Sequence, residues 1–431
     1  MPGGFVIAAP QSGSGKTTIT LGLLRALCRA GHVVRSAKAG PDFIDPAFHG
    51  AATGEACVNL DPWAMREDLI LNLVAENDAF LVVEGMMGLF DGGADGRGSA
   101  ADLALMLGPP IVLVVDAARQ SHSIAALVAG FRDHRETVNM AGVILNKVGS
   151  SRHEMMLREA LATIDMPVLG CVPRDDRLQQ KSRHLGLVQA REHGDLEGFL
   201  DGAADVMAQS IDVDALLQLT GSVRGEVSGN APPMPPPGQR IAIARDDAFA
   251  FLYPHLLAGW QSVGAEIQFF SPLNDETPFP DCDAVYLPGG YPELHGGKLA
   301  GNHNFKDGLK QAADRGALVY GECGGYMVLG ESLIDADGEA HQMANLLPLI
   351  TSFEKRKLHL GYRRATPIHA LPFAPIGKVL TAHEFHYSTV VRQVDQLALF
   401  TAKDARGEDL GPCGMVNGNV AGSYLHLIDQ T

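Results

Sequence analysis

The strongest constraint on the fold is a series of short, uniformly apolar runs, separated by segments with helical periodicity. In the first half of the chain these runs are FVIAA (5–9), FLVVEG (80–85), IVLVVDA (111–117), MAGVILN (140–146) and VLGCVP (168–173). Strands that are apolar on both faces indicate a sheet covered on both sides, and helices between them indicate a parallel order. We therefore predict a doubly wound parallel α/β sheet with its ligands at the carboxyl ends of the strands.

A change in composition divides the chain in two. Residues 220–238 lack apolar periodicity and are rich in Pro, Gly and Ser, which is typical of a linker. The strand pattern then restarts at 240–246, 265–272, 284–290 and 317–323. We predict one domain over 1–219, a linker over 220–238 and a second α/β domain over 239–431.

Charge and cysteine content exclude several classes of protein. The formal net charge of the 431 residues is -16, whereas nucleic acids and anionic membranes bind basic faces. We therefore expect no nucleic-acid partner and no membrane partner. The six cysteines show no C-x-x-C spacing, which predicts reduced thiols rather than disulfides or a zinc site. With no run of eighteen apolar residues, we expect a cytoplasmic enzyme.

The stretch AAPQSGSGKTT (8–18) joins a predicted strand to an amphipathic helix and has the pattern of a phosphate-binding loop. Backbone N–H groups of such a loop attract phosphate oxygens, and Gly13 and Gly15 allow the close approach. Lys16 would reach the β- and γ-phosphates, and the Thr17 hydroxyl would ligate Mg²⁺. Pro10 stands where the usual motif has its first glycine, so the loop is of a distinct subtype.

Carboxylates follow the loop at two places. The segment KAGPDFIDPAFH (38–49) holds Lys38, Asp42 and Asp45, and Glu84 ends a buried strand before a glycine-rich turn. A buried carboxylate needs a metal, a base role or a partner. Thr17, Asp45 and Glu84 would supply the oxygen ligands that Mg²⁺ prefers. Taken alone, the 38–49 segment is equally typical of a solvated turn.

Two further segments at strand ends suggest ligand contacts. Asn146 and Lys147 follow a strand and suit a nucleobase edge, although an ordinary strand-end turn has the same composition. The segment 172–187 is rich in cations within an acidic protein and includes Arg174, Arg183 and His184. Such a cluster at the ligand-binding edge of the sheet suits a polyanionic substrate, and the alternative is a solvated helix face.

The sequence GECGG (321–325) is a G-x-C-x-G turn between an apolar strand and a predicted helix. This pattern is the cysteine version of a nucleophile elbow, with Cys323 as the nucleophile. We expect the helix N-terminus to lower the pKa of the Cys323 thiol. The backbone N–H groups of Gly324 and of Gly290, in a second glycine-rich turn, would form an oxyanion hole.

A cysteine nucleophile needs a base. The chain has 16 histidines, of which His426 in GSYLHL (422–427) and His383 and His386 in TAHEFHYS (381–388) lie near plausible strand ends. Spacing alone does not choose among these three.

In combination, these motifs resemble those of the cobyrinic and hydrogenobyrinic acid a,c-diamide synthases, which are glutamine amidotransferases of cobalamin biosynthesis. The resemblance rests on APQSGSGKTT (9–18), KAGPDFIDP (38–46), EGMMGLFDG (84–92) and GECGGY (321–326), which occur in the order of the family. It extends over nearly the whole chain. It implies an N-terminal synthetase domain similar to dethiobiotin synthetase and a C-terminal class I glutamine amidotransferase domain.

The resemblance also implies an activity. Such an enzyme uses ATP, L-glutamine and Mg²⁺ to amidate the a and c acetate carboxylates of a corrin macrocycle, either cobyrinic or hydrogenobyrinic acid. The carboxylate is activated as an acyl phosphate, and the ammonia is released from glutamine. Related domains often pair, which makes a homodimer an expectation as well.

Roles for individual residues follow from the matching motifs. The nucleotide-binding set is Gly13, Gly15, Lys16, Thr17 and Thr18, and Pro10 fits the loop of this family. Asp45 and Glu84 match the magnesium ligands, and Lys38 and Asp42 the substrate-side loop. Cys323 matches the glutaminase nucleophile, and His426 the histidine that activates it.

One residue departs from the class I pattern, in which a glutamate stands two positions after the histidine. Ile428 occupies that position here, so we expect a Cys–His dyad with modest glutaminase turnover. Glu322 or Glu384 could substitute, and the sequence does not choose between them.

Three other functions share part of these motifs. Cobyric acid synthase and nickel-sirohydrochlorin a,c-diamide synthase are amidotransferases with similar sites. A partitioning-type regulatory ATPase shares the phosphate loop but needs neither the Cys323 elbow nor a second domain.

Overall fold

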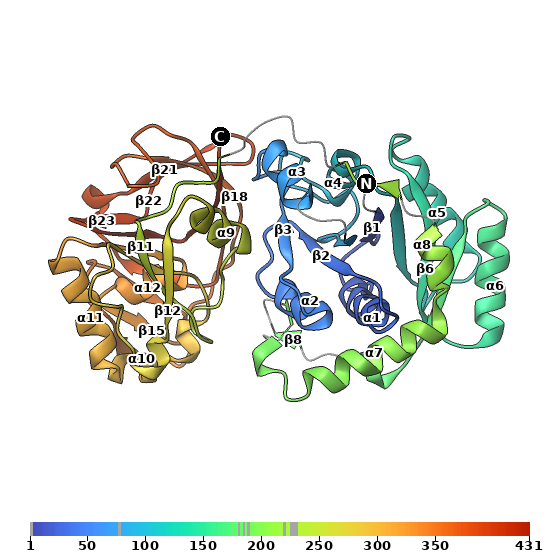
Figure 1. The fold of residues 1–431 in the computed structure, drawn as a ribbon, viewed down its shortest axis with the longest axis horizontal. Helices are drawn as coiled ribbons and strands as arrows, with labels where there is room; N and C mark the ends of the chain where they lie inside the picture. Colours follow the sequence, from blue (N-terminus) through green and yellow to red (C-terminus); the bar gives the residue numbers. More distant parts are fainter. Residues whose placement is uncertain are drawn as a thin grey trace. The chain divides into compact units, whose positions relative to one another are not determined.

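The computed structural model describes residues 3–75, 79–179, 182–183, 186–187, 190–218, 221–224 and 232–431. The chain divides into two compact units, of which Figure 1 shows the elements. The first unit comprises Met1–Trp63 and Glu67–Ala231, and the second comprises Ala64–Arg66 and Pro232–Thr431. The predicted α/β class is confirmed, because both units contain a parallel sheet with packed helices.

The first unit is built on one sheet, which has eight strands within the described residues. Seven run parallel in the order β3-β2-β4-β1-β5-β6-β7, and β10 pairs antiparallel with β1. This crossing order is that of a doubly wound sheet. The strands are β1 (Gly3–Ala8), β2 (Val34–Ala39), β3 (Val58–Leu60), β4 (Phe80–Glu84), β5 (Ile111–Asp116), β6 (Met140–Val148), β7 (Val168–Pro173) and β10 (Gly221–Ser222).

Helices cover this sheet, and α1 packs against both α2 and α7 while α5 packs against α6. Alternate residues of the central strands, such as Phe5, Ile7 and Val114, share one apolar core with residues of α1 and α7. The helices are α1 (Lys16–Arg29), α2 (Asp45–Thr53), α3 (Glu67–Ala75), α4 (Ala100–Leu107), α5 (Ser123–Asp133), α6 (Ser151–Ala162), α7 (Leu196–Ser210) and α8 (Val213–Gln218). The short elements are η1 (Asp176–Leu178), β8 (Ser182–Arg183), β9 (Gly186–Leu187) and η2 (Ala190–Glu192).

The second unit contains three sheets. A six-stranded sheet has the order β12-β11-β13-β14-β24-β23 and is parallel except for β23. Its strands are β11 (Arg240–Ala244), β12 (Glu266–Phe270), β13 (Ala284–Leu287), β14 (Leu318–Glu322), β23 (Met415–Asn417) and β24 (Val420–Ser423). Helices and turns accompany it, namely α9 (Pro254–Ser262), η3 (Pro272–Asn274), η4 (Pro292–Leu294), α10 (Gly296–Gly301), α11 (His303–Asp314) and α12 (Gly324–Leu329).

An antiparallel sheet and a small mixed sheet, in which β15 and β17 pair parallel, complete this unit. A five-stranded sheet has the order β22-β21-β18-β19-β25, with β18 (His359–Pro367), β19 (Leu380–His386), β21 (Phe400–Asp404), β22 (Asp409–Cys413) and β25 (Leu425–Gln430). A smaller sheet joins β15 (Ser332–Ile334), β16 (Ala340–Gln342), β17 (Ile350–Ser352) and β20 (Thr389–Arg392), and η5 covers Asp395–Leu397.

The last two strands link the two larger sheets of the second unit. β24 pairs with β14 in the parallel sheet, and β25, separated from β24 by Tyr424 alone, belongs to the antiparallel sheet. Asp429 of β25 accepts hydrogen bonds from the backbone N–H and the guanidinium of Arg66, and residues 64–66 belong to this unit.

None of the helices in the described part of the chain combines the length and the apolar character that a membrane crossing requires.

The packing of α1 on α7 supplies a test of the first unit. A Cβ on Gly22 of α1 would lie 2.6 Å from Met207 Cγ and 2.8 Å from the carbonyl oxygen of Ala203, both on α7. We predict that Gly22→Ala lowers the free energy of unfolding by about 1–3 kcal/mol through overpacking. Denaturant titration of the intact chain measures this loss.

Gly130→Ala is the matched control. Gly130 lies within α5, and a Cβ there would meet no atom within 4 Å. Because glycine disfavours a helix interior, this change should leave stability unchanged or raise it by up to about 1 kcal/mol. Equal effects of the two substitutions would contradict the close packing of α1 on α7.

Candidate active sites

The phosphate-type loop lies between β1 and α1 and depends on two glycines with left-handed backbones. Gly13 has φ +79° and Gly15 has φ +93°, a region that other residues rarely adopt. A Cβ on Gly15 would also lie 2.1 Å from the Asn146 side-chain nitrogen. Asn146 donates from this nitrogen to the Ser14 carbonyl at 2.9 Å. The Asn146 side chain therefore supports the loop, while its predicted contact with a nucleobase stays a prediction.

Lys16 begins α1, and its side chain is almost fully buried. Its Nζ donates to the carbonyl oxygen of Met87, in the turn after β4, at 2.5 Å. Burial lowers the pKa of Lys16 to about 8, and Glu84 opposes part of this effect. A bound phosphate would place negative charge next to Lys16 and so stabilise its protonated, phosphate-binding form.

Next to Lys16, one hydroxyl group, two carboxylates and one ammonium group lie in contact with one another. Thr17 Oγ1 donates to Glu84 Oε1 at 2.7 Å and lies 3.2 Å from Asp45 Oδ2. Lys38 Nζ bridges the same carboxylates, at 2.6 Å from Asp45 Oδ2 and 2.8 Å from Glu84 Oε1. The structure thus brings the predicted metal residues together, and a hydroxyl with two carboxylates fits a hard cation such as Mg²⁺.

The predicted substrate-side residues of the 38–49 segment have local partners. The side chain of Lys38 is buried within the carboxylate cluster, and Asp42 Oδ2 lies 3.7 Å from its Nζ. Asp42 Oδ1 accepts from the backbone N–H groups of Ile44 and Asp45, at 2.8 and 3.0 Å. Asp42 therefore shapes the turn that places Asp45 at the first position of α2.

His49 is a member of this cluster that sequence reasoning missed. Its Nε2 lies 2.7 Å from Glu84 Oε2, and both side chains are fully buried. Its signal was present, because Asp45 and His49 are four residues apart on α2 and therefore share a face. Burial opposes a charge on His49, but Cys57 and Glu84 outweigh it and raise its pKa to about 10.

Opposite charges balance within this cluster. Burial alone would raise the pKa of Glu84, but Lys38 and His49 outweigh it and hold that pKa well below its usual range. Burial and the neighbouring Asp42 raise the pKa of Asp45 to about 6. Each oxygen of the Glu84 carboxylate thus has a cationic partner, which is how a charge tolerates a fully buried position.

The remaining predicted residues of the first unit lie at or beyond the strand ends. Lys147 Nζ pairs with Asp116 Oδ2 at 2.6 Å, across the ends of β6 and β5. Arg174 is exposed just after β7. Arg183 belongs to β8, where only the backbone is described, and His184 lies outside the described residues. A role for these residues in substrate binding stays a prediction.

The predicted nucleophile elbow is present in the second unit. Cys323 follows β14 and precedes α12, with φ +47° and ψ -103°, a strained conformation for a residue with a side chain. The flanking glycines are required sterically. A Cβ on Gly321 would lie 2.7 Å from the Gly325 carbonyl carbon, and one on Gly325 would lie 2.0 Å from the Leu287 oxygen.

Two glycine-rich turns converge beside this cysteine. A Cβ on Gly324 would lie 3.0 Å from the backbone nitrogen of Gly290, so the predicted oxyanion-hole residues are neighbours. A Cβ on Gly289 would lie 3.3 Å from Cys323 Cβ and 2.4 Å from His426 Cε1. Cys323 and His426 thus border the same small space, which the missing side chain of Gly289 leaves open.

The other two histidines that spacing left open have different surroundings. His383 faces His426 across the pairing of β19 with β25, and its ring contacts Tyr362 at 5.5 Å. His386 stacks on Tyr424, with ring centroids 3.7 Å apart. Only His426 among the three has the close approach to Gly289 next to Cys323, which agrees with the role that the resemblance gave it.

The expected lowering of the Cys323 pKa is wrong for this structure. Cys323 is only 3% exposed, and burial raises the pKa of its thiol, with a further contribution from Glu293. The Gly324 N–H at the start of α12 acts in the expected direction but is outweighed. Burial together with His383 and His386 lowers the pKa of His426 to about 3. The resting pair is therefore a neutral thiol and a neutral imidazole.

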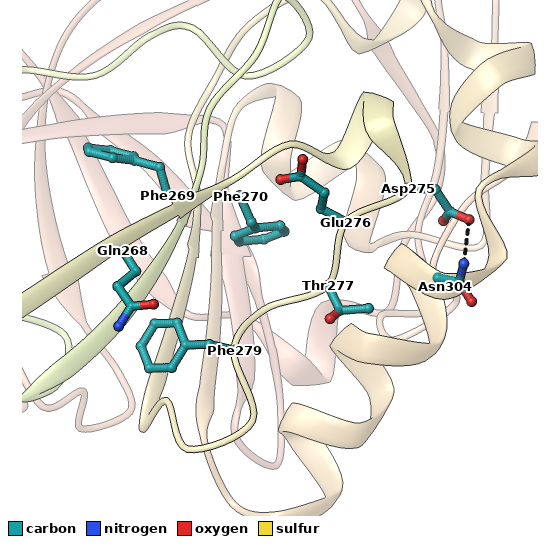
Figure 2. Close-up of a pocket in the computed structure, with 8 residues that line it drawn as sticks. All are labelled: Gln268, Phe269, Phe270, Asp275, Glu276, Thr277, Phe279 and Asn304. Carbon is teal, nitrogen blue, oxygen red and sulfur yellow. Dashed lines mark hydrogen bonds between the residues drawn. The ribbon is translucent and has the colours of Figure 1, made fainter.

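A separate pocket of about 510 Å³ lies at the edge strand β12 of the second unit (Figure 2). It is lined by Gln268, Phe269, Phe270, Asp275, Glu276, Thr277, Phe279 and Asn304. Asn304 donates to Asp275 at 2.9 Å across one side, and neither Cys323 nor His426 contributes to the lining. The pocket is thus distinct from the elbow.

Comparison with known proteins gives a family to each unit. Residues 5–188 match the CobQ/CobB/MinD/ParA nucleotide binding domain, and residues 240–430 match the CobB/CobQ-like glutamine amidotransferase domain. The first match holds the Lys16 loop and the carboxylate cluster. The second holds the Cys323 elbow and His426.

Curated relatives align with the chain over nearly its full length. Hydrogenobyrinate a,c-diamide synthase of Brucella anthropi is 59% identical over 431 residues, covering 99% of this chain and 98% of the relative. This chain belongs to the hydrogenobyrinate a,c-diamide synthase family. The family members of Rhizobium meliloti and Rhodobacter capsulatus are 57% and 50% identical, and each alignment covers 99% of both chains. The family resemblance inferred from the motifs is confirmed.

The buried pairing of His49 with Glu84 leads to a stability prediction. Replacing His49 by Ala leaves one oxygen of Glu84 without a cation and opens space beside it, while Lys38 still pairs with the other oxygen. We predict a loss of roughly 3 kcal/mol in the free energy of unfolding. Denaturant titration near pH 7 measures the loss.

His32→Ala is the control, since His32 is exposed in the loop between α1 and β2 and should change stability by less than about 0.5 kcal/mol. A His49→Ala protein as stable as the control would show that the pair contributes nothing to the fold.

Proposed function

We propose that the two sites perform the two halves of one reaction, the ATP- and glutamine-dependent amidation of the a and c acetate carboxylates of hydrogenobyrinic acid. The supporting observation is the identity of 50–59% with hydrogenobyrinate a,c-diamide synthases over nearly the full length of each chain. Both family models agree with this assignment. The protein is an ATP-dependent carbon–nitrogen ligase. A homodimer stays a prediction from the family.

The elbow carries out glutamine hydrolysis. Cys323 Sγ attacks the side-chain amide carbon of glutamine, and His426 takes the thiol proton and passes it to the departing ammonia. The Gly290 and Gly324 N–H groups face the oxyanion of the tetrahedral intermediate. Water then attacks the thioester, which releases glutamate and restores the thiol. Burial raises the pKa of the Cys323 thiol, so His426 has to take its proton as Sγ attacks.

The phosphate-loop site activates the carboxylate. A carboxylate oxygen of the macrocycle attacks the γ-phosphorus of ATP, ADP leaves, and an acyl phosphate forms. Ammonia then attacks the acyl carbon and inorganic phosphate leaves, giving the amide. Lys16 binds the β- and γ-phosphates, and Gly13, Gly15 and Thr18 belong to the loop that surrounds them. Lys147, Asp42, Arg174, Arg183 and His184 stay candidates for contacts with nucleotide or substrate.

Thr17, Asp45 and Glu84 would hold Mg²⁺, which when bound neutralises phosphate charge. Lys38 bridges the two carboxylates of this set. Without a metal ion, the Lys38 ammonium group neutralises charge on Asp45 and Glu84. With Mg²⁺ bound to these carboxylates, the same ammonium group would be available to orient the substrate carboxylate. His49 fixes the far oxygen of Glu84 and leaves the near one directed at Thr17.

The alternative functions receive less support. The description of the first matched domain also covers MinD and ParA proteins, so that match alone fits a partitioning-type ATPase. A partitioning-type ATPase does not need the glutamine amidotransferase domain that residues 240–430 match. The curated relatives are named for a,c-diamide synthesis rather than for cobyric acid or nickel-sirohydrochlorin chemistry.

Two substitutions test the division of labour. Cys323→Ser should abolish glutamine-dependent synthesis yet retain synthesis from added ammonium salts, because the phosphate-loop site is intact. Lys16→Ala should stop synthesis from either nitrogen source, because no acyl phosphate forms. Product formation under both conditions, followed by mass spectrometry, gives the four results.

Cys282→Ser is the matched control, since Cys282 is buried in the same unit as Cys323 but lies outside the elbow. It should retain both activities. Glutamine-dependent synthesis by Cys323→Ser would show that the nucleophile is misassigned, and synthesis by Lys16→Ala would overturn the nucleotide-loop assignment.

A further inference from the structure

The glutaminase site lacks its expected third member. Class I amidotransferases carry a glutamate two residues after the catalytic histidine. In this chain that position is Ile428, which is buried. The carbonyl oxygen of Ile428 lies 2.9 Å from the ring Nε2 of His255. A base histidine without a carboxylate loses the group that fixes its tautomer and stabilises its cation. Glu322 and Glu384 are the two replacements that the sequence left open.

Glu384 is already occupied by other partners. Its Oε2 accepts from Arg363 Nε at 2.8 Å and pairs with Arg363 Nη2 at 2.7 Å. Its Oε1 lies 3.1 Å from His386 Nε2. These contacts engage both oxygens and hold the pKa of Glu384 near 2 despite burial. On β19, Glu384 pairs in register with Leu425, whereas His426 pairs with His383. Glu384 is therefore committed to the Arg363 ion pair.

Glu322 has the geometry that the role requires. It is the last residue of β14, directly before Cys323, and is 2% exposed. Its Oε2 lies 4.0 Å from His426 Nδ1, the ring nitrogen that a triad carboxylate contacts. Its Oε1 accepts from the backbone N–H of Leu427, the residue after His426, at 3.3 Å. One carboxylate thus contacts the backbone of β25 and faces its catalytic imidazole.

We propose that Glu322 is the positioning residue for His426, so that the elbow supplies both the nucleophile and the carboxylate that orients the base. This inference rests on the proposed function of Cys323 and His426. An Nδ1–H directed at Glu322 leaves the Nε2 lone pair for the Cys323 proton. The 4.0 Å separation exceeds a hydrogen bond, and contacts of this kind tighten when the substrate complex forms. Glu322 itself gains no proton during turnover.

The surroundings of Glu322 give the proposal a pH signature. Burial raises the pKa of Glu322 to about 8, and hydrogen bonds from Tyr286 and the Leu427 backbone oppose this rise. The titratable groups that face the pair are Tyr286, Tyr320, Cys323, His383, His386 and Glu384. Only the ionised carboxylate supplies the negative charge that stabilises the His426 imidazolium, so glutaminase activity should rise as pH increases through about 8.

The test compares isosteric Gln substitutions at the two carboxylates, with Glu322→Asp as the variant that keeps the charge, all in the full-length chain. Glu322→Gln should lower kcat for glutamine hydrolysis by about 10²- to 10⁴-fold with a smaller effect on KM, and should remove the rise of activity near pH 8. Glu322→Asp keeps the charge and should restore part of the rate together with the pH dependence. Glu384→Gln, at the competing carboxylate, should keep the pH dependence. Synthesis from ammonium salts reports in each case whether the rest of the enzyme is intact.

Each outcome decides the proposal. Glu322→Gln with a near-normal rate and an unchanged pH profile overturns it, as does loss of the pH dependence in Glu384→Gln instead. If Glu322→Gln fails to fold, ¹⁵N-histidine spectra of the wild-type protein decide, with the His426 signal assigned by His426→Gln. An Nδ1–H tautomer above pH 8 supports the proposal, and an Nε2–H tautomer contradicts it. Failure of the underlying function is distinguishable, because Cys323→Ser would then still hydrolyse glutamine.

Discussion

Both sites depend on the same physical constraint, a charged or nucleophilic side chain at the carboxyl end of a buried parallel strand. Glu84 ends β4, and Glu322 ends β14 directly before Cys323. At these positions the ladder of backbone hydrogen bonds stops and the chain turns sharply. Side chains there are buried yet face an edge that ligands can reach. In the proposed reaction, the groups around each carboxylate determine what that carboxylate can do.

The two carboxylates are stabilised in opposite ways. Glu84 is surrounded by Lys38, His49 and Thr17, and these partners keep it ionised although it is fully buried. Glu322 has tyrosines and a neutral imidazole nearby, and burial raises its pKa to about 8. A permanently charged carboxylate suits a cation and phosphate site. A carboxylate with a pKa of about 8 suits a proton-transfer site, where its charge matters most once the imidazole becomes a cation.

The sequence was sufficient for the fold class because uniformly apolar strands and intervening helices leave few arrangements. It was sufficient for the loop and the elbow because Gly13, Gly15, Gly321 and Gly325 occupy positions where a side chain would be strained or would clash. Local backbone requirements of this kind are visible as residue types at fixed spacing. The order of the motifs also indicated the family, and the full-length relatives confirm that family.

Contacts between distant segments could not be predicted in the same way. The hydrogen bond from Asn146 to the Ser14 carbonyl connects residues more than a hundred positions apart. From the sequence, the Asn146 side chain was predicted only to contact a nucleobase. The i, i+4 spacing of Asp45 and His49 places both on one face of α2, but only the folded chain brings Glu84 of β4 against that face. The thiol pKa was misjudged because the helix after Cys323 spans only Gly324–Leu329, while burial, which no motif reveals, acts on the whole side chain.

The central claim is that nitrogen released at the elbow is incorporated into a carboxylate activated at the phosphate loop. Incubation of the enzyme with ATP, hydrogenobyrinic acid and glutamine labelled with ¹⁵N in its side-chain amide tests it directly. Mass spectrometry should show a product with two amide groups that both carry ¹⁵N, and none without ATP. A product with unlabelled amides, with four amides, or formed without ATP would contradict the account.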